Sequence, residues 1–294
     1  MHSIFMKSTI KLSVALAVYN EEENLAECLE TVKDIADEIV IVDGGSSDKT
    51  VEIAHKFNAR IQITSNPRIF HINKQKALEM AKNTWILQLD ADERVTKKLA
   101  EEILMIISLT NDEIKDYQRK IKDINLFTRH QKLLEERDGV VGRSDSDYAA
   151  FFIPRRNFFL GRFLRYGGTY PDGVIRLVKK NKAHFPCLSV HEQIKVDGNA
   201  GWLESDLLHM ADPTFKRYLT RNNKYINLLV DELRQKDTEK NLNSFIKFFF
   251  IRPIAWFFWT QIRHKGILDG IPGIIFSFFS ALRFPRAYYR YLKT

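Results

Sequence analysis

Three carboxylates stand within four residues in the segment Leu87–Arg94, which reads LQLDADER. The preceding run, WILQL, is typical of a buried strand, and Asp90, Asp92 and Glu93 follow it directly. Crowded carboxylates repel one another unless a cation or hydrogen-bond donors stand between them. Two interpretations therefore fit this segment: a divalent metal site, or a strand end followed by a helix whose first turn favours acidic residues. For Glu93 we expect the helical role.

Strand-like and helix-like segments alternate up to this point. Apolar or β-branched runs are followed by stretches with helical spacing of apolar residues, and the runs cover 12–18, 39–42, 59–64 and 85–90 while the helical stretches cover 21–36, 50–57 and 72–83. This order predicts an α/β fold with a mainly parallel sheet flanked by helices. Ligands of such sheets bind beyond the carboxyl ends of the strands. Asn20, Asp43 and Asp90 all stand just past predicted strand ends, which favours a binding site there.

The loop after the second predicted strand reads DGGSSDKT and begins at Asp43. Its glycines let the backbone approach a ligand closely, and a carboxylate at Asp43 can accept a hydrogen bond from the N–H of a uracil or guanine ring. The alternative is a turn-forming Asp. Ser47 or Asp48 is expected to cap the helix that follows. If the strand before Asp90 continues, Asp90 and Asp92 project to the same side.

The remainder of the chain predicts two parts. A charged helical insertion is expected at about 106–142, followed by short strands joined by Gly and Pro turns and by an amphipathic helix over 214–236. The apolar stripe of that helix is expected to hold Tyr218, Tyr225, Leu228, Leu229 and Leu233. We therefore divide the chain into a nucleotide-binding domain, 1–240, and an amphipathic helical tail, 241–294.

Charge and cysteine content narrow the class of protein. The net charge is +8, and the tail holds eight Lys and Arg residues against one Asp, so the rest of the chain is almost neutral and we expect no nucleic-acid partner. Cys28 and Cys187 lack the spacing of a zinc site or a disulfide framework, which fits a reducing compartment. The short run LSVALAV has no cleavage site and reads as a first strand rather than a signal peptide.

The tail combines aromatic residues with scattered basic residues. Its apolar runs are interrupted by Lys247, Arg252, Pro253, Asp269 and Pro272, and neither run offers the roughly 20 uninterrupted apolar residues of a membrane span. Short apolar helices with Trp, Tyr, Arg and Lys at their borders are typical of segments that lie in a membrane interface. The alternatives are a hydrophobic hairpin packed on the body and a subunit interface.

The chain resembles the family 2 glycosyltransferases, which adopt the GT-A fold. The matching segments are SVALAVYNEEENLAECLE, EIVIVDGGSSDKTVEIA, QKALEMAKNTWILQLDADE, YPDGVIRLVKK, VHEQI and LLH, which occur in the family's order over roughly residues 12–230. Together with the tail, they look like the bacterial branch that includes the lipopolysaccharide core β-glucosyltransferases.

This resemblance implies roles for the matching residues. Tyr19, Asn20, Glu21 and Glu22 would frame the nucleotide pocket, and Asp43 would bind the base. Asp90 and Asp92 would form the Asp-x-Asp element, which contacts the donor and holds Mg²⁺ or Mn²⁺ against its diphosphate. Glu192 falls in the place of the general base. Two departures stand out: Gly44 replaces a second Asp, and His191-Glu192 replaces a Glu-Asp pair.

Further roles rest on the same resemblance. His191 is the rival to Glu192 as base, because imidazole titrates near neutral pH. His209 would be a third metal ligand, with a core histidine as the alternative. Arg155, Asp172 and Arg176 would bind the acceptor or the diphosphate.

The sequence thus predicts a metal-dependent, inverting hexosyltransferase that uses a nucleotide-diphosphate sugar, most simply a UDP-linked hexose. The acceptor would be a hydroxyl of a bacterial envelope glycan or glycolipid such as lipopolysaccharide core, and the enzyme would work in the cytoplasm, peripherally on an anionic inner membrane surface. The alternatives are a polyprenyl-phosphate glycosyltransferase, a nucleotidyltransferase, and a non-catalytic nucleotide-sugar-binding membrane module. A nucleotidyltransferase would show a Gly-rich loop with Arg and Lys after the first strand, where this chain has YNEEEN. The sequence predicts no oligomeric state.

Overall fold

A computed structural model describes residues 10–188 and 193–294. Contacts group the chain into two compact units, which are described separately below. Unit 1 holds the described residues up to Arg155 and from Pro171 to Leu208, and unit 2 holds Arg156–Tyr170 and His209–Thr294. By these contacts, residues 209–240 group with the C-terminal residues. Whether a functional domain ends at residue 240 stays a prediction.

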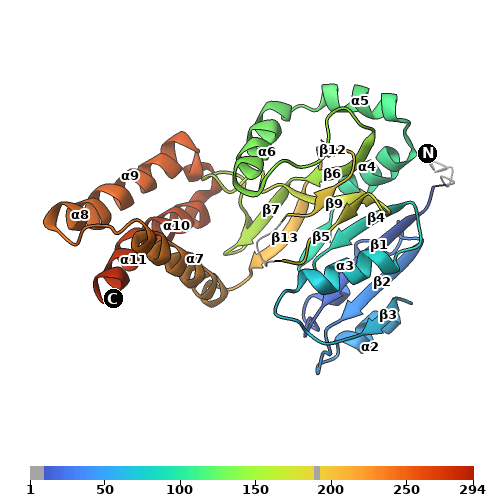
Figure 1. The fold of residues 1–294 in the computed structure, drawn as a ribbon, viewed down its shortest axis with the longest axis horizontal. Coiled ribbons are helices and arrows are strands. Elements are labelled where there is room, and N and C mark those ends of the chain that lie inside the picture. The colour runs from blue at the N-terminus through green and yellow to red at the C-terminus, as the bar shows by residue number, and fades with distance from the viewer. Residues whose placement is uncertain (1–9, 189–192) are drawn as a thin grey trace. The chain divides into compact units, whose positions relative to one another are not determined.

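Unit 1 is built on a seven-stranded sheet (Figure 1). Its strands, in spatial order, are β12 (Asn199–Trp202), β6 (Tyr148–Ile153), β9 (Val174–Lys179), β4 (Trp85–Leu89), β1 (Leu12–Val18), β2 (Glu38–Asp43) and β3 (Arg60–Ile63). All neighbours are parallel except β9, which is antiparallel to both β4 and β6. The predicted α/β class with a mainly parallel sheet is confirmed.

Six helices belong to unit 1: α1 (Leu25–Glu30), α2 (Thr50–Lys56), α3 (His71–Met80), α4 (Lys97–Ser108), α5 (Asn111–Lys120) and α6 (Ile124–Asp138). The short strands β5 (Glu93–Val95), β10 (Ala183–His184) and β11 (Lys195–Val196) complete it. Helix α1 is shorter than predicted, because residues 31–35 form turns. The residue before α2 is Lys49, whose side chain makes no capping bond, so neither Ser47 nor Asp48 is the N-cap that the sequence predicted. The Asp48 carboxylate does accept the Thr50 N–H at the start of the helix, at 3.0 Å.

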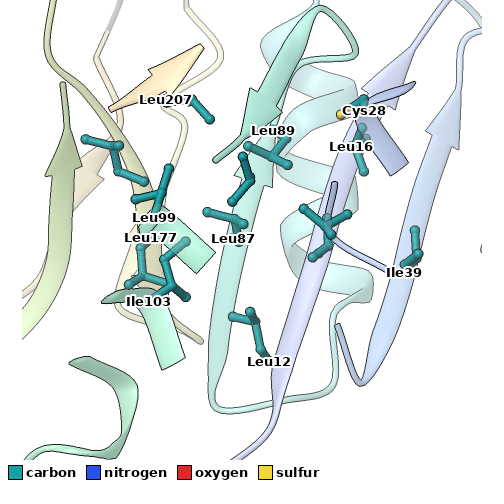
Figure 2. Packing of buried hydrophobic residues seen from close by; sticks show 14 of the residues in the cluster. Leu12, Leu16, Cys28, Ile39, Leu87, Leu89, Leu99, Ile103, Leu177 and Leu207 are labelled. Atoms are coloured by element: carbon teal, nitrogen blue, oxygen red, sulfur yellow. The ribbon is translucent and has the colours of Figure 1, made fainter. Parts of the chain in front are cut away.

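The core of unit 1 explains why β4 is apolar at nearly every position. All five residues of β4 are buried, as expected for a central strand with covered faces. Figure 2 shows Leu87 and Leu89 among apolar side chains of β1, α4 and β9, including Leu16, Leu99 and Leu177. Helix α4 contributes through the spacing of its buried residues, Leu99, Ile103, Ile106 and Ile107.

The charged insertion, α5 and α6, packs against β12 at the edge of the sheet. The side-chain amide of Gln118 accepts the Trp202 N–H and donates to the Trp202 carbonyl, both at 2.8 Å. Phe127 stacks on the Trp202 ring at 4.7 Å, and Gln131 accepts its indole N–H at 3.0 Å. Because β12 is an edge strand, these bonds satisfy backbone groups that its missing neighbour would have paired.

Unit 2 contains most of three strands and the C-terminal helices. The chain passes between the units within β7 (Arg155–Phe159) and β13 (Leu207–Asp212), and β7 pairs with β8 (Arg162–Phe163). The helices are α7 (Phe215–Gln235), α8 (Leu242–Ile246), α9 (Arg252–Phe258), α10 (Gly270–Ala281) and α11 (Arg283–Leu292), with the π-helical turns η1 (Lys247–Ile251) and η2 (Trp259–Arg263) and the 3₁₀ turn η3 (Gly266–Asp269).

The apolar stripe predicted for α7 is partly wrong. The buried stripe of α7 runs through Tyr218, Asn222, Ile226, Val230 and Leu233, so Tyr225 and Leu228 lie on its exposed face.

The tail also contains a candidate membrane span. Within the described residues one helical stretch, Gly266–Leu292, is long and apolar enough to cross a membrane by length and composition alone. This finding leaves the expectation of a tail that does not span the membrane untested. The charges of this stretch lie at Asp269 and from Arg283 onward, which leaves the residues between them uncharged.

The first prediction concerns Gln118. Replacing it with Ala leaves the Trp202 N–H and carbonyl without these partners, which should lower the free energy of unfolding by about 1–3 kcal/mol. Urea unfolding measures this change. The control is Gln235→Ala at the exposed end of α7, which should have little effect. Equal values for the two variants would show that the insertion does not support the sheet edge.

Candidate functional site

The topology of unit 1 gathers several polar segments at one edge of the sheet. Strands β1, β2 and β4 are parallel, with Val18 beside Asp43 and Leu16 beside Leu89, so their carboxyl ends share this edge. Strand β9 runs antiparallel to β4 and β6, with Val174 beside Ile153. Its first residues and the end of β6 therefore reach the same edge, which brings together the segments that carry Asn20, Asp43, Asp90, Arg155, Asp172 and Arg176.

The loops after β1 and β2 are joined by hydrogen bonds. Asn20 adopts the left-handed backbone conformation (φ 52°), which Asn tolerates better than most residues. Its N–H donates to Ser46 Oγ at 2.8 Å, and its side-chain carbonyl accepts the Ser47 N–H at 2.9 Å. The Glu22 carboxylate accepts the Lys49 N–H at 3.1 Å. The loop 19–22 is thereby fixed to the loop 44–49, and Tyr19 within it remains about half exposed.

Asp43 shapes the loop that it begins. Its side chain is buried, and Oδ2 accepts the N–H groups of Gly45 and Ser46, each at 2.8 Å. Oδ1 accepts the Ser46 hydroxyl at 2.5 Å. The turn-forming role that the sequence left open is therefore present. A contact of Asp43 with a nucleotide base stays a prediction.

The segment after β4 differs from the expectation. Strand β4 ends at Leu89, and the Glu93 N–H donates to the Asp90 carbonyl at 3.0 Å in a tight turn. Asp90 and Asp92 thus lie in this turn rather than on a continued strand. Glu93 does not begin a helix. It is the first residue of β5 and is fully buried, and its carboxylate pairs with two arginines.

Asp90 is held between two buried cations. Lys74 Nζ of α3 lies 2.5 Å from Oδ1, and the Arg176 guanidinium of β9 lies 2.5 Å from Oδ2. The guanidinium also donates to the side-chain carbonyl of Gln88, next to Asp90. These contacts fix the carboxylate at the end of β4 and give Arg176 a position that its sequence motif did not specify.

Glu93 binds two arginines beneath this pair. Arg176 Nη2 lies 2.8 Å from Glu93 Oε1, and Arg155 Nη1 lies 3.2 Å from the same oxygen. Glu93 Oε2 accepts the Asp90 N–H at 3.0 Å. Arg155 continues the set to Asp172, with Nη2 3.0 Å from Oδ2. Three carboxylates and three cations therefore form one connected ion-pair network: Asp90, Glu93, Asp172, Lys74, Arg155 and Arg176.

Opposite charges within the network oppose the effect of burial on the pKa values of Asp90, Lys74 and Arg155. Burial alone raises the pKa of Asp90, but the charges of Arg176 and Lys74 outweigh it and hold that pKa well below its ordinary value. Burial lowers the pKa of Lys74, although the Asp90 charge opposes the shift. For Arg155, burial also acts to lower the pKa, and the charges of Asp172 and Glu93 outweigh it, so its pKa is raised.

Asp92 lies in the same turn and is partly exposed, and both Asp90 oxygens bind cations. The metal-binding roles of Asp90 and Asp92 stay predictions. Within residues 10–188 and 193–294, no group of three or more His, Cys, Asp or Glu side chains is arranged to hold a metal by itself. This donor set still fits Mg²⁺ or Mn²⁺, since hard cations bind through one or two carboxylates when substrate phosphates and waters supply the other ligands.

The remaining predicted residues are not placed at this edge. His191 and Glu192 lie outside the described residues, so their assignment as bases stays a prediction. His209 belongs to unit 2, where its Nδ1 lies 2.6 Å from the Asn157 side-chain oxygen. A side-chain oxygen at this position holds the imidazole ring in a fixed orientation. The role of His209 as a metal ligand stays a prediction. Cys28 and Cys187 are free thiols, as expected.

The sequence did not predict that Lys74 and Glu93 are members of the ion-pair network. Lys74 had a visible signal: it lies three and four residues before Ala77 and Leu78, on the buried stripe of α3. A lysine on such a stripe is almost never buried unless it is paired. Glu93 had no such signal, because its burial follows from the turn at 90–93 and from arginines distant in sequence.

Comparisons with known proteins identify the family of this chain. A family model described as "Glycosyl transferase family 2" matches residues 13–183, which include the strands of the carboxyl edge. A Rhizobium meliloti protein named "Lipopolysaccharide core biosynthesis glycosyltransferase LpsC" is 27% identical over 93% of this chain and 92% of its own length. An uncharacterized glycosyltransferase of Rickettsia conorii is 26% identical over 94% of this chain and 89% of its own. Among solved structures, S. aureus TarS is 15% identical, covers 92% of this chain and 81% of its own, and has a TM-score of 0.39.

The second prediction tests the network. Glu93→Gln removes the negative charge that Arg155 and Arg176 share, and breaking a buried ion pair in this way should cost about 3–5 kcal/mol of unfolding free energy. The matched control is Glu27→Gln. Glu27 also pairs with an arginine, Arg94 at 3.1 Å, but its side chain is 74% exposed, so the loss should stay below about 1 kcal/mol. Similar losses in urea unfolding for both variants would contradict the assignment of Glu93.

Proposed function

The chain belongs to glycosyl transferase family 2, and we propose that it transfers a hexose from a nucleotide-diphosphate sugar to a hydroxyl of a bacterial envelope glycolipid, with lipopolysaccharide core as the acceptor. The observation that carries this proposal is the similarity to LpsC, which extends over nearly the full length of both chains and so includes both units. The reducing environment suggested by two free cysteines supports a cytoplasmic location.

The donor would bind at the carboxyl edge of unit 1. The loops 19–22 and 44–49 are fixed to each other there, which supports a preorganised nucleotide pocket. Asp43 Oδ1 accepts one bond within the loop, and a carboxylate oxygen can accept a second from the N–H of a base such as uracil. Tyr19, Asn20 and Glu22 would border this pocket.

Asp92 would hold a Mg²⁺ or Mn²⁺ ion with the help of the donor phosphates. Such an ion acts as a Lewis acid on the departing diphosphate. Asp90 would instead fix Lys74 and Arg176 at the strand end, where their N–H groups could donate to a diphosphate. Arg155 and Asp172 would support that position through Glu93 and the turn before β9.

The transfer itself is a displacement at the anomeric carbon. The acceptor oxygen forms the new bond on the face opposite the diphosphate, the old bond breaks with its electrons going to the diphosphate oxygen, and the configuration inverts. The hydroxyl proton goes to a general base. We assign this role to Glu192, with His191 as the neighbour that the experiment below distinguishes from it.

The third prediction concerns Asp92. Asp92→Asn keeps the shape of the side chain and removes its charge, so the affinity for UDP in Mn²⁺ should fall by roughly ten-fold or more, since loss of one charged ligand costs on the order of 1.4 kcal/mol or more. The affinity in EDTA should hardly change. Asp34→Asn, an exposed carboxylate elsewhere in unit 1, is the control. Wild-type affinities that are equal in Mn²⁺ and EDTA would exclude a metal at this site.

The fourth prediction concerns the base. Glu192→Gln should retain UDP binding and lower turnover by about 10²-fold or more, the scale of general-base loss. Transfer of radiolabelled sugar to lipopolysaccharide core and to polyprenyl phosphate, assayed in parallel, also tests the acceptor class. If His191→Ala abolishes turnover while Glu192→Gln is nearly unaffected, the base is His191. Transfer to polyprenyl phosphate alone would replace the proposed acceptor.

A further inference from the structure

The tail hairpin, residues 242–281 of unit 2, exposes a surface that is mostly apolar, with exposed polar residues at Asn243, Lys247 and 263–265. Its first arm is the helical run α8, η1, α9 and η2, and its second arm is η3 and α10 (Figure 1). On the first arm, exposed apolar residues recur every four positions: Leu242, Ile246, Phe250, Ile254, Phe258 and Ile262. The π-helical turns hold more residues per turn than an α-helix, which keeps this spacing in line along the arm.

The second arm repeats the pattern. Its exposed side chains are Ile267, Leu268, Ile271, Ile274 and Phe278. Between Phe250 and Ile262 on the first arm, every exposed residue is likewise apolar. Contiguous apolar surface of this kind is rare on monomeric proteins in water and marks an interaction site.

Polar and small residues face the inside of the hairpin. Gln261 is buried and donates to Ser277 Oγ at 2.6 Å and to the Gly273 carbonyl at 3.2 Å. Trp256 Nε1 donates to Ser280 Oγ at 3.0 Å. A Cβ on Gly273 would lie 2.3 Å from the Gly266 carbonyl oxygen, so only glycine fits there. Polar contacts and close backbone approach thus join the two arms to each other. Apolar contacts join them to the rest of unit 2, since Phe248 stacks on Tyr288 and Phe276 and Phe279 contact Tyr218.

This arrangement is the reverse of a water-soluble hairpin. In water, the apolar stripe of a helix faces the protein core. Helices in lipid pack through small residues and interhelical hydrogen bonds and turn their apolar side chains outward. From this inversion we propose that the tail hairpin lies in the interface of an anionic lipid bilayer, with Phe250, Ile254, Phe258 and Trp259 among the residues in the acyl-chain boundary. The proposal rests on the proposed function only in that the acceptor glycolipid would be met at this surface.

The charge of the tail is complementary to an anionic surface. Arg286 and Arg290 donate to the Asn223 and Asn227 side chains, and Arg283 lies over the Trp256 ring at 4.3 Å. These contacts involve neutral groups and leave the tail's positive charge in place. Each basic residue near anionic lipid contributes about 1 kcal/mol. The same charge opposes pairing of this surface with a second copy of the chain, so lipid is the better partner.

Contacts at both ends of the second arm join the hairpin to the rest of unit 2. They favour a hairpin that lies in the plane of the membrane surface over one that spans the membrane. Asp269 accepts the Arg165 N–H at 3.0 Å and the Tyr166 N–H at 2.8 Å. Beyond α10, helix α11 buries Tyr288 and Tyr291 in a cluster with Ile226 and Val230 of α7. A span by Gly266–Leu292 would have to break these contacts, whereas an in-plane helix keeps them.

Vesicle binding by the full chain is the fifth prediction. The intact protein should float with vesicles of phosphatidylglycerol and phosphatidylcholine more than with phosphatidylcholine alone, and the difference should shrink with salt, because the Debye length falls from about 10 Å at 0.1 M to about 3 Å at 1 M. Trp85 and Trp202 are buried in unit 1, so a blue shift of tryptophan fluorescence on vesicle addition would come from Trp256 and Trp259. Trp259→Phe should reduce it.

A double variant tests the apolar face. Ile254→Glu with Phe258→Glu should weaken vesicle binding by roughly ten-fold or more while leaving UDP affinity unchanged. Leu133→Glu, an exposed apolar position on α6 of unit 1, is the matched control and should bind vesicles like wild type. Neither assay requires turnover, so the membrane proposal can fail while the proposed reaction stands.

Three results would overturn the proposal. One is equal binding to neutral and anionic vesicles at every salt concentration. Another is a double variant that binds vesicles as tightly as wild type. The last is light scattering that shows a wild-type dimer and a monomeric double variant with no vesicle binding by either, which would assign the hairpin to an interface between copies of this chain.

Discussion

The buried ion-pair network around Asp90 and Glu93 is the constraint on which the carboxyl edge depends. Lys74, Glu93 and Arg176 are buried, and Asp90, Arg155 and Asp172 are partly buried. Such burial is costly unless each charge meets an opposite one, and here three carboxylates are matched by three cations. The requirement fixes α3, the turn after β4, the first residues of β5 and β7, and the segment 172–176 to one another, because each contributes one or more members. Removing a single member leaves a buried charge without its balance, so the network specifies this geometry more strictly than apolar packing does.

The antiparallel strand β9 is what makes such a network possible in a mainly parallel sheet. A parallel strand would carry its amino end to the opposite edge, far from Asp90. Because β9 runs the other way, Leu177 lies beside Leu87 and Arg176 falls next to Gln88 and Asp90. The two loops that follow β1 and β2 are organised separately, by Asn20, Asp43 and the serines between them. One edge therefore combines a charge-balanced ion-pair network with a hydrogen-bonded pair of loops.

The sequence predicted what local patterns determine. The β-branched run at 39–42 and the apolar run at 85–89 are strands because they are buried on both faces. It failed where distant residues decide. Glu93 became a buried partner of Arg155 and Arg176, and Tyr225 and Leu228 turned outward because α7 packs through Ile226 and Val230. The sequence showed that the tail is apolar and basic. It did not show that the polar side chains of Gln261 and Ser277 meet inside the hairpin while apolar side chains face outward.

A structure of the protein with UDP and Mn²⁺ tests the division of labour between the two aspartates most directly. The account predicts Mn²⁺ on the Asp92 carboxylate and on phosphate oxygens of UDP, with Asp90 still paired to Lys74 and Arg176. Anomalous scattering of manganese would locate the ion without ambiguity. A metal bound by Asp90, with Lys74 displaced and the ion-pair network opened, would contradict it.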